Sequence, residues 1–583
     1  MRSQLGQCRF YILNCRFSIR EVLVAARLRS SGYLPAMRFT SAALALFLVA
    51  CSERVSNGPA PSGGTIVIAT LDDPGTLFPP FVMTNSAKQI SEQIYDYLAD
   101  VGANLDTRDE KSYRAELADS WRWSADSLSL TFHLNPRARW HDGQRVTARD
   151  VRFTFDLNKN PAIASRYQSS LENIDSVTIA DSSSAVFWFR ERRPTQFLDA
   201  AAQLLILPAH QLEKLAQTRL RESLPPPIGS GRFRLRRWDK GVAVELVSDT
   251  TNYRGRARLD RAIWSVTRDF TAAVSRVARG DADLFDGLRP ENASDIARGA
   301  TARAVMLPGM DYAFLRFNLR DPANATKPHP LFGDRELRRA IAMSLDRNSL
   351  ARSLFDTFAS VPSGPTVRAY ATTDTTLIQI PFDLARANRL LDSLGWMRVA
   401  DGVRGRNGSK LTFSLLVPTT SLNRTKIAVL IQEQLRRVGI QVNTDRLDNA
   451  AMIAKEQKGD FDASLDAWTM SSSPDGIRDA WSSSGVGKNG VNYGGYTNPL
   501  FDTLLDSALR GAPGHARERF TAAYRVINED APAVWLYEAR KIVGIHRRFT
   551  TGETRADSWW FSLADWSVDP TRRLLRDRIA PGR

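Results

Sequence analysis

The sequence predicts a large α/β protein, and three observations lead to this fold class. Segments rich in β-branched or alternating apolar residues are interspersed with segments that carry apolar residues at helical spacing, without a fixed repeat length. The 583 residues are 43% hydrophobic, 24% charged and 9% aromatic, which is ordinary for a globular protein and excludes wholesale disorder, collagen and coiled coil. The three cysteines, Cys8, Cys15 and Cys51, lie in the first tenth of the chain, so the rest holds neither a disulfide framework nor a Cys-rich zinc site.

The segment that begins at Met37 has the features of an export signal. A single cation, Arg38, precedes an apolar run that is too short to span a bilayer as a mature helix. Leu48–Cys51 resembles a bacterial lipobox, in which Cys51 is diacylated and becomes the new N-terminus. The alternative is a buried apolar helix that happens to contain a cysteine. Residues 52–64 follow as a tether rich in Pro, Gly and Ser.

Residues 1–36 hold six Arg and one Glu and show no helical or strand period. We interpret them as an upstream extension before the true start at Met37; the alternatives are a long signal n-region or an organelle transit peptide. The net charge of +16 suggests nucleic acid as a partner. Removing residues 1–50 takes away seven Arg and one Glu and lowers the net charge to +10. Much of the positive charge that suggests a nucleic-acid partner therefore lies in the leader sequence.

Four segments of the remaining chain are predicted to be strands. Thr65–Thr70 is a β-branched run typical of a buried strand, and Leu128–Leu134 alternates apolar and polar residues. Ala185–Phe189 and Val242–Val247 have similar composition. The basic segment Arg234–Trp238 is expected on a strand at the edge of a sheet, and not in a nucleic-acid interface.

Helices are predicted where apolar residues share one face. Asp383–Leu394 has such a stripe and is followed by a capping Gly395, and Lys426–Val438 is similar. Asp334 is placed to N-cap a third helix. A further helix is expected over Ser86–Leu98. Proline- and glycine-rich breaks at residues 224–231, 321–330 and 485–495 separate the elements.

The most informative block runs from Leu117 to Phe155. It contains a strand, the tetrapeptide Trp140–Gly143 with an Asp-Gly turn, and a helix start in which Thr147 and Asp150 form a capping-box variant. This block resembles the solute-binding proteins of peptide- and nickel-type ABC importers, that is, bacterial extracellular solute-binding protein family 5. Further matches occur in the same order as in that family, at Pro227–Phe233, Gly280–Asp283, Leu315–Asn318, His329–Phe332, Leu337–Ala342, Phe382–Trp396, Phe461–Asp462 and Glu529–Pro532.

The resemblance implies a two-lobed periplasmic-binding-protein fold, class II-like, with an extra subdomain on lobe I. The lobes are expected to close on a ligand by a hinge motion and to deliver it to a membrane permease. The implied organisation is residues 1–50 as extension and signal, 51–64 as lipidated Cys51 and tether, 65–311 as lobe I with the subdomain at about 100–200, 312–539 as lobe II, and 540–583 as the return to lobe I. Both crossovers are expected near Tyr312–Asn318 and Val534–Val543.

In this family the ligand lies between the lobes, against a loop of lobe II that contains a Trp. The matching residues are Trp468, Met470 and Ser471, and for Trp468 the alternative is a core position. Peptide-binding members carry an Asp at the position of Ser471, where it pairs with the peptide ammonium. A hydroxyl does not supply that charge, so free peptides are in question unless Asp475 substitutes through a shifted loop.

Four other residues are candidates for the ligand wall. Asn492 and Tyr493 lie in the Gly-rich loop, where they are equally compatible with plain loop positions. Met83 and Asn85 match the lobe I wall by position only. Asp281, Asp283 and Asp286 offer carboxylates for acid–base or metal chemistry, but caps and turns explain them more simply.

No catalytic motif competes with the binding-protein hypothesis. The sequence has no Gly-x-Ser-x-Gly elbow, no His-Glu-x-x-His and no phosphate-binding loop. We therefore expect a monomeric, non-enzymatic, cofactor-free protein of the periplasm or cell envelope, held to the membrane by a lipid anchor, with a peptide or other small molecule and ABC permease subunits as partners. The alternatives are a glycoside or nickel chelate as solute, an exported hydrolase, and a nucleic-acid-binding protein, for which only charge argues.

Overall fold

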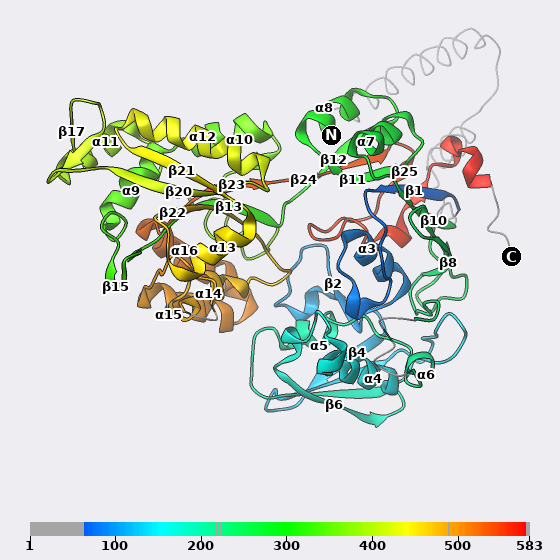
Figure 1. The fold of residues 1–583 in the computed structure, drawn as a ribbon. Coiled ribbons are helices and arrows are strands. Elements are labelled where there is room, and N and C mark those ends of the chain that lie inside the picture. Colours follow the sequence, from blue (N-terminus) through cyan, green and yellow to red (C-terminus); the bar gives the residue numbers. More distant parts are fainter. Residues whose placement is uncertain (1–62, 216–219, 221–223, 488–489, 579–583) are drawn as a thin grey trace, which may run out of the picture. The chain divides into compact units, whose positions relative to one another are not determined.

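The computed structural model describes residues 63–215, 220, 224–487 and 490–578 of the chain (Figure 1). The predicted leader and the predicted lipidation site at Cys51 lie outside the described residues. Within the described part, no helix is both long enough and apolar enough to cross a membrane.

The first large sheet has seven strands in the order β12-β24-β11-β1-β10-β9-β8. They are β1 (Thr65–Thr70), β8 (Phe233–Asp239), β9 (Ala243–Ser248), β10 (Arg261–Val266), β11 (Leu284–Leu288), β12 (Ala302–Leu307) and β24 (Lys541–His546). β1 pairs in parallel with β10, whereas β24 inserts antiparallel between β11 and β12 (Figure 1). The sheet is therefore completed only by the last part of the chain.

Helices cover both faces of this sheet. Ile68 belongs to the apolar cluster that includes Ile90 of α3 (Asn85–Ile94), while the next residue, Ala69, belongs to the cluster that includes Val277 of α7 (Phe270–Arg279) and Ile296 of α8 (Pro290–Arg298). Successive residues of a strand point to opposite faces of the sheet. A strand that is buried on both faces therefore has a continuous run of apolar residues in its sequence. This explains why Thr65–Thr70 shows no alternation.

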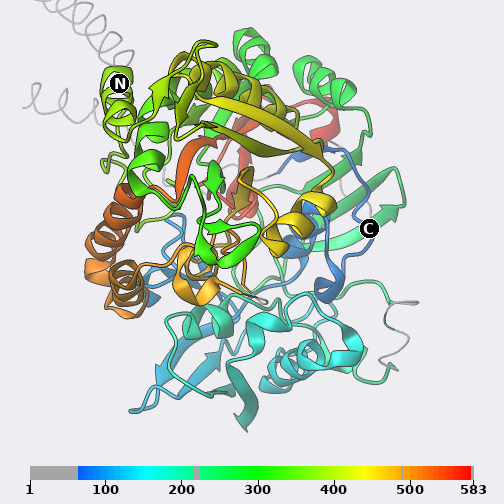
Figure 2. The same ribbon diagram turned by 60° about the vertical axis from the view of Figure 1, so that its left-hand side comes forward.

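The second large sheet has six strands in the order β16-β23-β13-β22-β20-β21. They are β13 (Asp311–Phe317), β16 (Ala359–Ser360), β20 (Thr412–Pro418), β21 (Gln441–Leu447), β22 (Ala463–Thr469) and β23 (Ala533–Ala539). One face packs on α9 (Arg335–Ser344), α10 (Arg347–Phe355), α11 (Leu384–Ser393) and α12 (Leu422–Arg437). The other packs on α13 (Asn449–Lys458), α14 (Gly476–Trp481) and the adjacent helices α15 (Pro499–Arg510) and α16 (Ala516–Asp530) (Figure 2).

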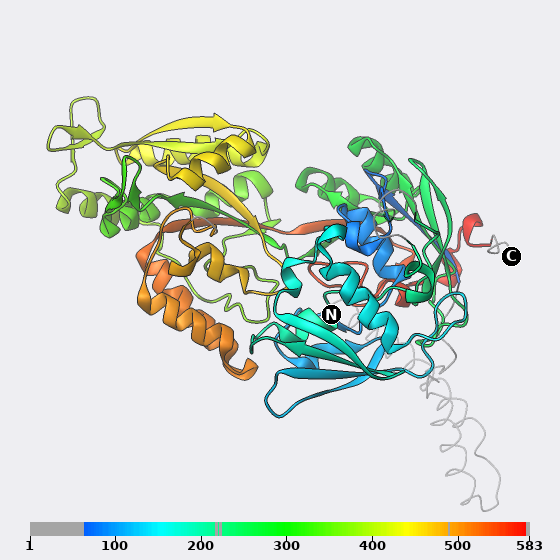
Figure 3. The same ribbon diagram turned by 60° about the horizontal axis from the view of Figure 1, so that its bottom comes forward.

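The chain passes between the two sheets twice. It leaves β12 after Leu307 and enters β13 at Asp311, and it returns from the end of β23 at Ala539 to the start of β24 at Lys541 (Figure 3). A Cβ atom at Gly309 would lie 1.9 Å from the carbonyl oxygen of Ala539. The two passing segments thus run side by side so closely that only glycine fits at position 309.

A smaller antiparallel sheet has the order β4-β5-β7-β6. Its strands are β4 (Ala118–Trp123), β5 (Ser129–Leu134), β6 (Ile174–Asp181) and β7 (Ser184–Phe189), and α4 (Ala148–Lys159) packs on β6 and β7 (Figure 3). The predicted capping box is confirmed, because the Asp150 carboxylate accepts from the Thr147 backbone N–H at 2.8 Å and the Thr147 side chain faces the third helical N–H.

The predicted strands, the N-cap at Asp334 and the helix predicted from Asp383 are confirmed, and Arg234–Trp238 lies on β8, an edge strand. The helix predicted over Ser86–Leu98 is wrong at its end, because α3 stops at Ile94. Tyr95 is extended, and the chain then holds Asp96 against Tyr253 and Arg254. Helical spacing alone gives no sign of this long-range attachment.

Candidate functional site

A cavity of about 810 Å³ lies where stretches distant in sequence meet. Segments within 88–101 and 166–203 line it from the N-terminal part of the chain, 471–479 and 509–510 from the middle part, and 555–557 from near the C-terminus. Seven cationic and seven anionic side chains are among its lining residues. A cavity so lined is suited to a solute that carries charges of both signs.

A buried guanidinium organises one wall. Arg555 donates from Nε to Asp557 Oδ1 at 2.6 Å and from Nη1 to Asp100 Oδ1 at 2.9 Å, and Nη1 also reaches the Val101 carbonyl oxygen at 2.5 Å. Its guanidinium carbon lies 4.9 Å from the centre of the Phe561 ring. Arg555 is only 5% exposed, so this arrangement is fixed by the packing around it.

Burial raises the pKa of three of the other lining carboxyls, which belong to Asp199, Asp475 and Glu92. It raises the pKa of Asp199 to about 7, and it raises the pKa of Asp475 although Ser473 and Arg108 oppose the shift. It also raises the pKa of Glu92, whose oxygens accept from the Tyr97 hydroxyl at 3.0 Å and from Trp560 Nε1 at 2.6 Å. Burial alone would raise the pKa of Asp557 too, but the Arg555 guanidinium outweighs it and keeps that pKa below its usual value.

The opposite wall is a serine-rich loop that a tyrosine holds in place. The Tyr370 hydroxyl lies 2.6 Å from the carbonyl oxygen of Ser471 and 3.0 Å from that of Ser473. Within the loop the Ser471 hydroxyl donates to the Ser473 carbonyl at 2.8 Å. Ser472 reaches across to the wall that carries Arg555, donating to Asp557 Oδ2 at 3.2 Å.

Replacing Tyr370 with Phe is expected to destabilise this loop. The ring stays buried, but the loop loses the single hydroxyl hydrogen that the carbonyls of Ser471 and Ser473 share, so the free energy of unfolding should fall by about 1–2 kcal/mol. Urea unfolding at pH 7 measures the change. Tyr493→Phe is the matched control, and an equal loss in both variants would contradict a specific role for Tyr370.

The three residues predicted from the lobe II loop lie at different depths. Trp468 is half-buried on β22, opposite Tyr312 of β13, and packs against the apolar core. Met470 is part of that core and is 8% exposed. Ser471 is exposed and lines the cavity. The structure thus brings Ser471 to the cavity and gives Trp468 and Met470 contacts with the core.

Asn492 and Tyr493 make contacts within the middle part of the chain. The buried Asn492 amide donates to the carbonyls of Ser482 at 2.9 Å and Tyr496 at 2.8 Å, so it fastens its own loop. The ring of Tyr493 lies 5.2 Å from the guanidinium of Arg316. Neither residue is among those that line the 810 Å³ cavity.

Met83 and Asn85 lie at the start of α3. Met83 is 81% exposed, and Asn85 is exposed and donates to Asp286 Oδ2 at 3.1 Å. The same carboxylate oxygen accepts from Gln89 at 2.8 Å and from Trp559 at 3.0 Å. Asn85 therefore takes part in a polar cluster that joins α3 to the strand β11.

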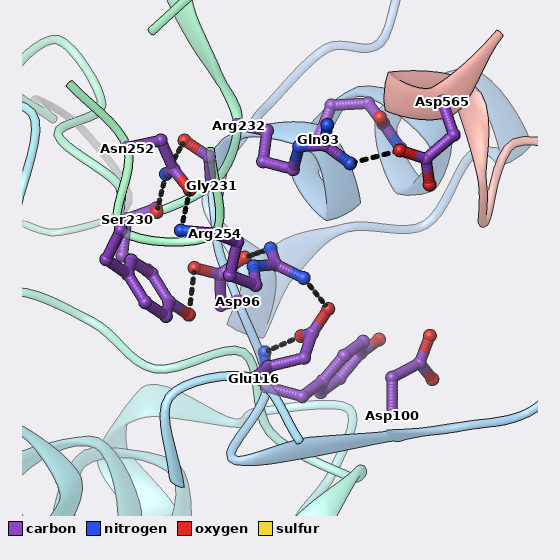
Figure 4. Close-up of polar contacts among 12 residues, drawn as sticks. Gln93, Asp96, Asp100, Glu116, Ser230, Gly231, Arg232, Asn252, Arg254 and Asp565 are labelled. Atoms are coloured by element: carbon purple, nitrogen blue, oxygen red, sulfur yellow. Dashed lines mark hydrogen bonds and ion pairs between the residues drawn. The ribbon is translucent and has the colours of Figure 1, made fainter. Parts of the chain in front are cut away.

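A second ionic cluster lies beside the 810 Å³ cavity and is not part of its lining. Figure 4 shows the Arg254 guanidinium between the carboxylates of Asp96 and Glu116. Asp96 also accepts from the Tyr253 hydroxyl at 3.0 Å, and burial raises the pKa of Glu116 to about 7 despite Arg254. An adjoining cavity of about 210 Å³, which includes Glu116 and Arg254, shares Glu92 with the larger one.

The Asp281–Asp286 carboxylates form no metal site. Among the described residues, no group of three or more His, Cys, Asp or Glu side chains is arranged to hold a metal ion. Asp283 instead lies in a buried ion pair with Arg548, and Asp281 pairs at the surface with Arg279. We predicted that these residues cap helices or lie in turns, and that prediction did not include the buried ion pair between Asp283 and Arg548.

Sequence reasoning missed most of the cavity wall. Glu92, Asp100, Arg555 and Asp557 come from segments without a family-like motif, and their meeting depends on tertiary contacts. The one local signal lies in residues 555–561, where the charged residues Arg555 and Asp557 are followed by three consecutive aromatic residues, which is unusual for an exposed loop.

Comparisons with known proteins identify the family to which the chain belongs. Residues 112–489 match the family described as bacterial extracellular solute-binding proteins, family 5, middle region. The chain is 27% identical over 514 residues to the oligopeptide-binding protein AppA of Bacillus subtilis (strain 168), covering 85% of this chain and 91% of that protein. It is 25% identical over 484 residues to the probable D,D-dipeptide-binding periplasmic protein DdpA of Escherichia coli (strain K12), covering 81% and 88%.

Among solved structures, HbpA2 of Haemophilus parasuis has a TM-score of 0.76 at 20% identity, over 87% of this chain and 100% of that one. This likeness confirms the predicted α/β, two-lobed periplasmic-binding-protein fold. The family match spans well over half of the 583 residues. The chain therefore belongs to the bacterial extracellular solute-binding proteins, family 5.

Proposed function

We propose that this protein is the extracytoplasmic solute-binding component of an ABC importer and that its solute is a peptide or peptide-like molecule. The observation that carries the proposal is the 810 Å³ cavity with seven basic and seven acidic side chains in its lining. A peptide presents an ammonium, a carboxylate and backbone groups, which such a lining matches. A neutral glycoside needs fewer charges. The names of AppA and DdpA, both peptide binders, support this choice.

We assign lobe I to residues 65–311 and 540–583 and lobe II to 312–539, in accord with the two sheets. Ser471 stands on the lobe II wall of the cavity. Capture works by hinge closure about the segments near Gly309 and Arg540, and the closed form is passed to the permease without any chemical step. A lipid on Cys51 holds the protein to the membrane in the periplasm.

A thermal-shift screen of the chain from Ser52 onward tests the function. Tri- to pentapeptides, glycosides and nickel chelates are added in turn. A solute at a hundred times its dissociation constant adds about 2.7 kcal/mol to the free energy of unfolding, and we expect this for peptides. The variant Ser471→Trp, which places a large ring on the cavity wall, should lose the shift, whereas Ser409→Trp on an exposed hairpin should keep it.

A shift with glycosides or nickel chelates alone would replace the peptide with that solute. If no small solute produced a shift while the protein hydrolysed an ester or glycoside, the binding-protein function would be refuted in favour of an exported hydrolase.

A further inference from the structure

A turn of lobe I contacts the end of a helix of lobe II beside the cavity. The turn lies between β2 (Ala99–Val101) and β3 (Tyr113–Ala115) and carries Arg108. Nη2 of Arg108 donates to the carbonyl oxygens of Leu509 at 2.9 Å and of Gly511 at 2.6 Å, at the end of α15. Because Leu509 also lines the 810 Å³ cavity, this contact between the lobes lies at the edge of that cavity.

The end of α15 takes its donor from outside the helix. In an α-helix each carbonyl accepts from the N–H four positions later, but four positions after Leu509 the chain has Pro513, which has no N–H. The chain has already left the helix at Gly511, where ψ is 162°. A cation at a helix C-terminus also interacts favourably with the partial negative charge there. The Arg108 guanidinium therefore supplies both a hydrogen-bond donor and a positive charge at this helix end.

The turn holds Arg108 in a defined position. The Asp106 carboxylate accepts from the backbone N–H of Arg108 at 3.2 Å. Leu105 is 3% exposed and belongs to the same apolar cluster as Leu509 and Phe520. The guanidinium carbon of Arg108 lies 5.8 Å from the centre of the Phe520 ring. Because the backbone of the turn is already fixed, docking costs little more than the rotamer freedom of one side chain.

The docking of Arg108 is incomplete in a way that suits a reversible contact. Its Nε and Nη1 atoms are buried and have no hydrogen-bond partner among the described residues. Burial also lowers the pKa of Arg108, although the carboxylates of Asp475 and Asp106 oppose the shift. By contrast, Arg548, whose partners all belong to lobe I, donates from Nε, Nη1 and Nη2. When the lobes separate, water hydrates the two unused nitrogens of Arg108, which offsets part of the loss of its two hydrogen bonds.

We propose that Arg108 is a reversible latch that ties lobe I to the end of α15 and stabilises the closed form, in the free protein as well as around a solute. This inference rests on the hinge closure of the proposed function and names a contact that sets how often the lobes part. The latch contacts two backbone carbonyls and one ring of lobe II. Its loss should therefore favour opening whichever solute the cavity holds.

The relative populations of closed and open lobes test the latch without any solute. The chain from Ser52 onward contains none of the three cysteines, and Pro61–Arg583 forms one compact unit. Spin labels are attached through Arg122→Cys on β4 and Arg525→Cys on α16, both at exposed positions, and double electron–electron resonance at pH 7 gives the two populations. Arg108→Met, which keeps an apolar stem, should lower the ratio of closed to open forms by about 5- to 30-fold.

Two further variants separate the latch from a general effect of charge. Lys111→Met removes an exposed cation from the same connection and should leave the ratio within about 2-fold of the natural value. Arg108→Lys keeps the charge but not the planar guanidinium, and it should lower the ratio by a smaller factor of about 2- to 5-fold. Arg108→Lys also covers the case in which Arg108→Met fails to fold, as judged by circular dichroism. A natural ratio in Arg108→Lys would then overturn the proposal.

A second measurement follows the release of a solute. The tightest peptide of the thermal-shift screen should dissociate about 5- to 30-fold faster from Arg108→Met than from the natural chain in stopped flow, with a nearly unchanged association rate. An unchanged dissociation rate would contradict a latch around the bound solute. An unchanged ratio of closed to open forms in Arg108→Met, or an equal fall in Lys111→Met, would overturn the latch and leave the proposed function standing. If no peptide binds, the proposed function fails, and the populations in the free chain alone decide whether Arg108 is a latch.

Discussion

Replacing Arg548 with Met is expected to lower the free energy of unfolding by about 3–5 kcal/mol at pH 7. The Arg548 side chain is 0% exposed, as are those of its partners Asp283 and Asp577. It makes a bidentate pair with Asp283 at 2.9 and 3.0 Å and donates to Asp577 at 2.5 Å. Without the guanidinium, two carboxylates would remain buried beside the seven-stranded sheet with too little compensation.

These three residues also join β1 to the C-terminal segment of the described residues. Asp283 accepts from the backbone N–H of Val67 at 2.8 Å, and Asp577 accepts from that of Thr65 at 2.8 Å. Loss of Arg548 should therefore loosen β1 together with the C-terminal segment, and hydrogen exchange of the β1 amides should rise along with the fall in urea stability.

Arg279→Met is the matched control for Arg548→Met. Arg279 is 65% exposed and pairs with Asp281 at the surface, so its loss should cost less than about 1 kcal/mol. Equal losses in the two variants would show that the buried network contributes nothing specific.

Local patterns in the sequence were sufficient to predict four of the strands and several of the helices. Thr65–Thr70 could be recognised from its β-branched composition, and the helix over Asp383–Leu394 from an apolar stripe that is followed by Gly395. The insertion of β24 between β11 and β12 could not be predicted in this way, because it depends on pairing between residues more than 200 positions apart. Only the family resemblance indicated that the chain returns to the first lobe.

The candidate site was harder to predict than the fold. Ser471 could be placed because the segment around Trp468 resembles the loop that lines the ligand in the family. Asp557 accepts a hydrogen bond from Ser472, the residue after Ser471, although the two are 85 positions apart in the sequence. Asp557 lies in a loop with no helical or strand period. Asn492 illustrates the opposite difficulty: a polar residue among glycines suits a ligand contact, yet its amide is used by two carbonyls of its own loop. Sequence alone does not distinguish these uses of an amide.

Replacing Arg316 with Met should produce the second large effect, in the six-stranded sheet. Arg316 is 2% exposed and lies 3.3 Å from Glu456 Oε1 and 3.4 Å from Asp466 Oδ2. The rings of Phe314, Trp481 and Tyr493 surround its guanidinium at 5.2, 5.8 and 5.2 Å. Its removal leaves two facing carboxylates in an apolar surrounding, so we expect a loss of about 3–5 kcal/mol at pH 8.

The loss should depend on pH in a defined direction. Burial and the neighbouring Asp466 raise the pKa of Glu456 to about 8, although Arg316 opposes the shift. Between the unfolded pKa near 4.5 and the folded value, only the folded chain holds this proton, so stability falls as pH rises through that interval. Without Arg316 the pKa of Glu456 rises further, and the folded chain pays a growing cost as pH increases.

The difference between Arg316→Met and the natural chain should therefore be smallest near pH 5 and largest near pH 9, as measured by urea unfolding across this range. Adding Glu456→Gln to the variant removes the titrating group and should flatten the dependence, recovering about 1–3 kcal/mol at high pH. Arg436→Met, at a 76% exposed position paired with Glu433 on α12, serves as the control and should change stability by less than about 1 kcal/mol. A loss that is the same at pH 5 and pH 9 would mean that lost packing against the three rings, and not the uncompensated carboxylates, accounts for the effect of Arg316.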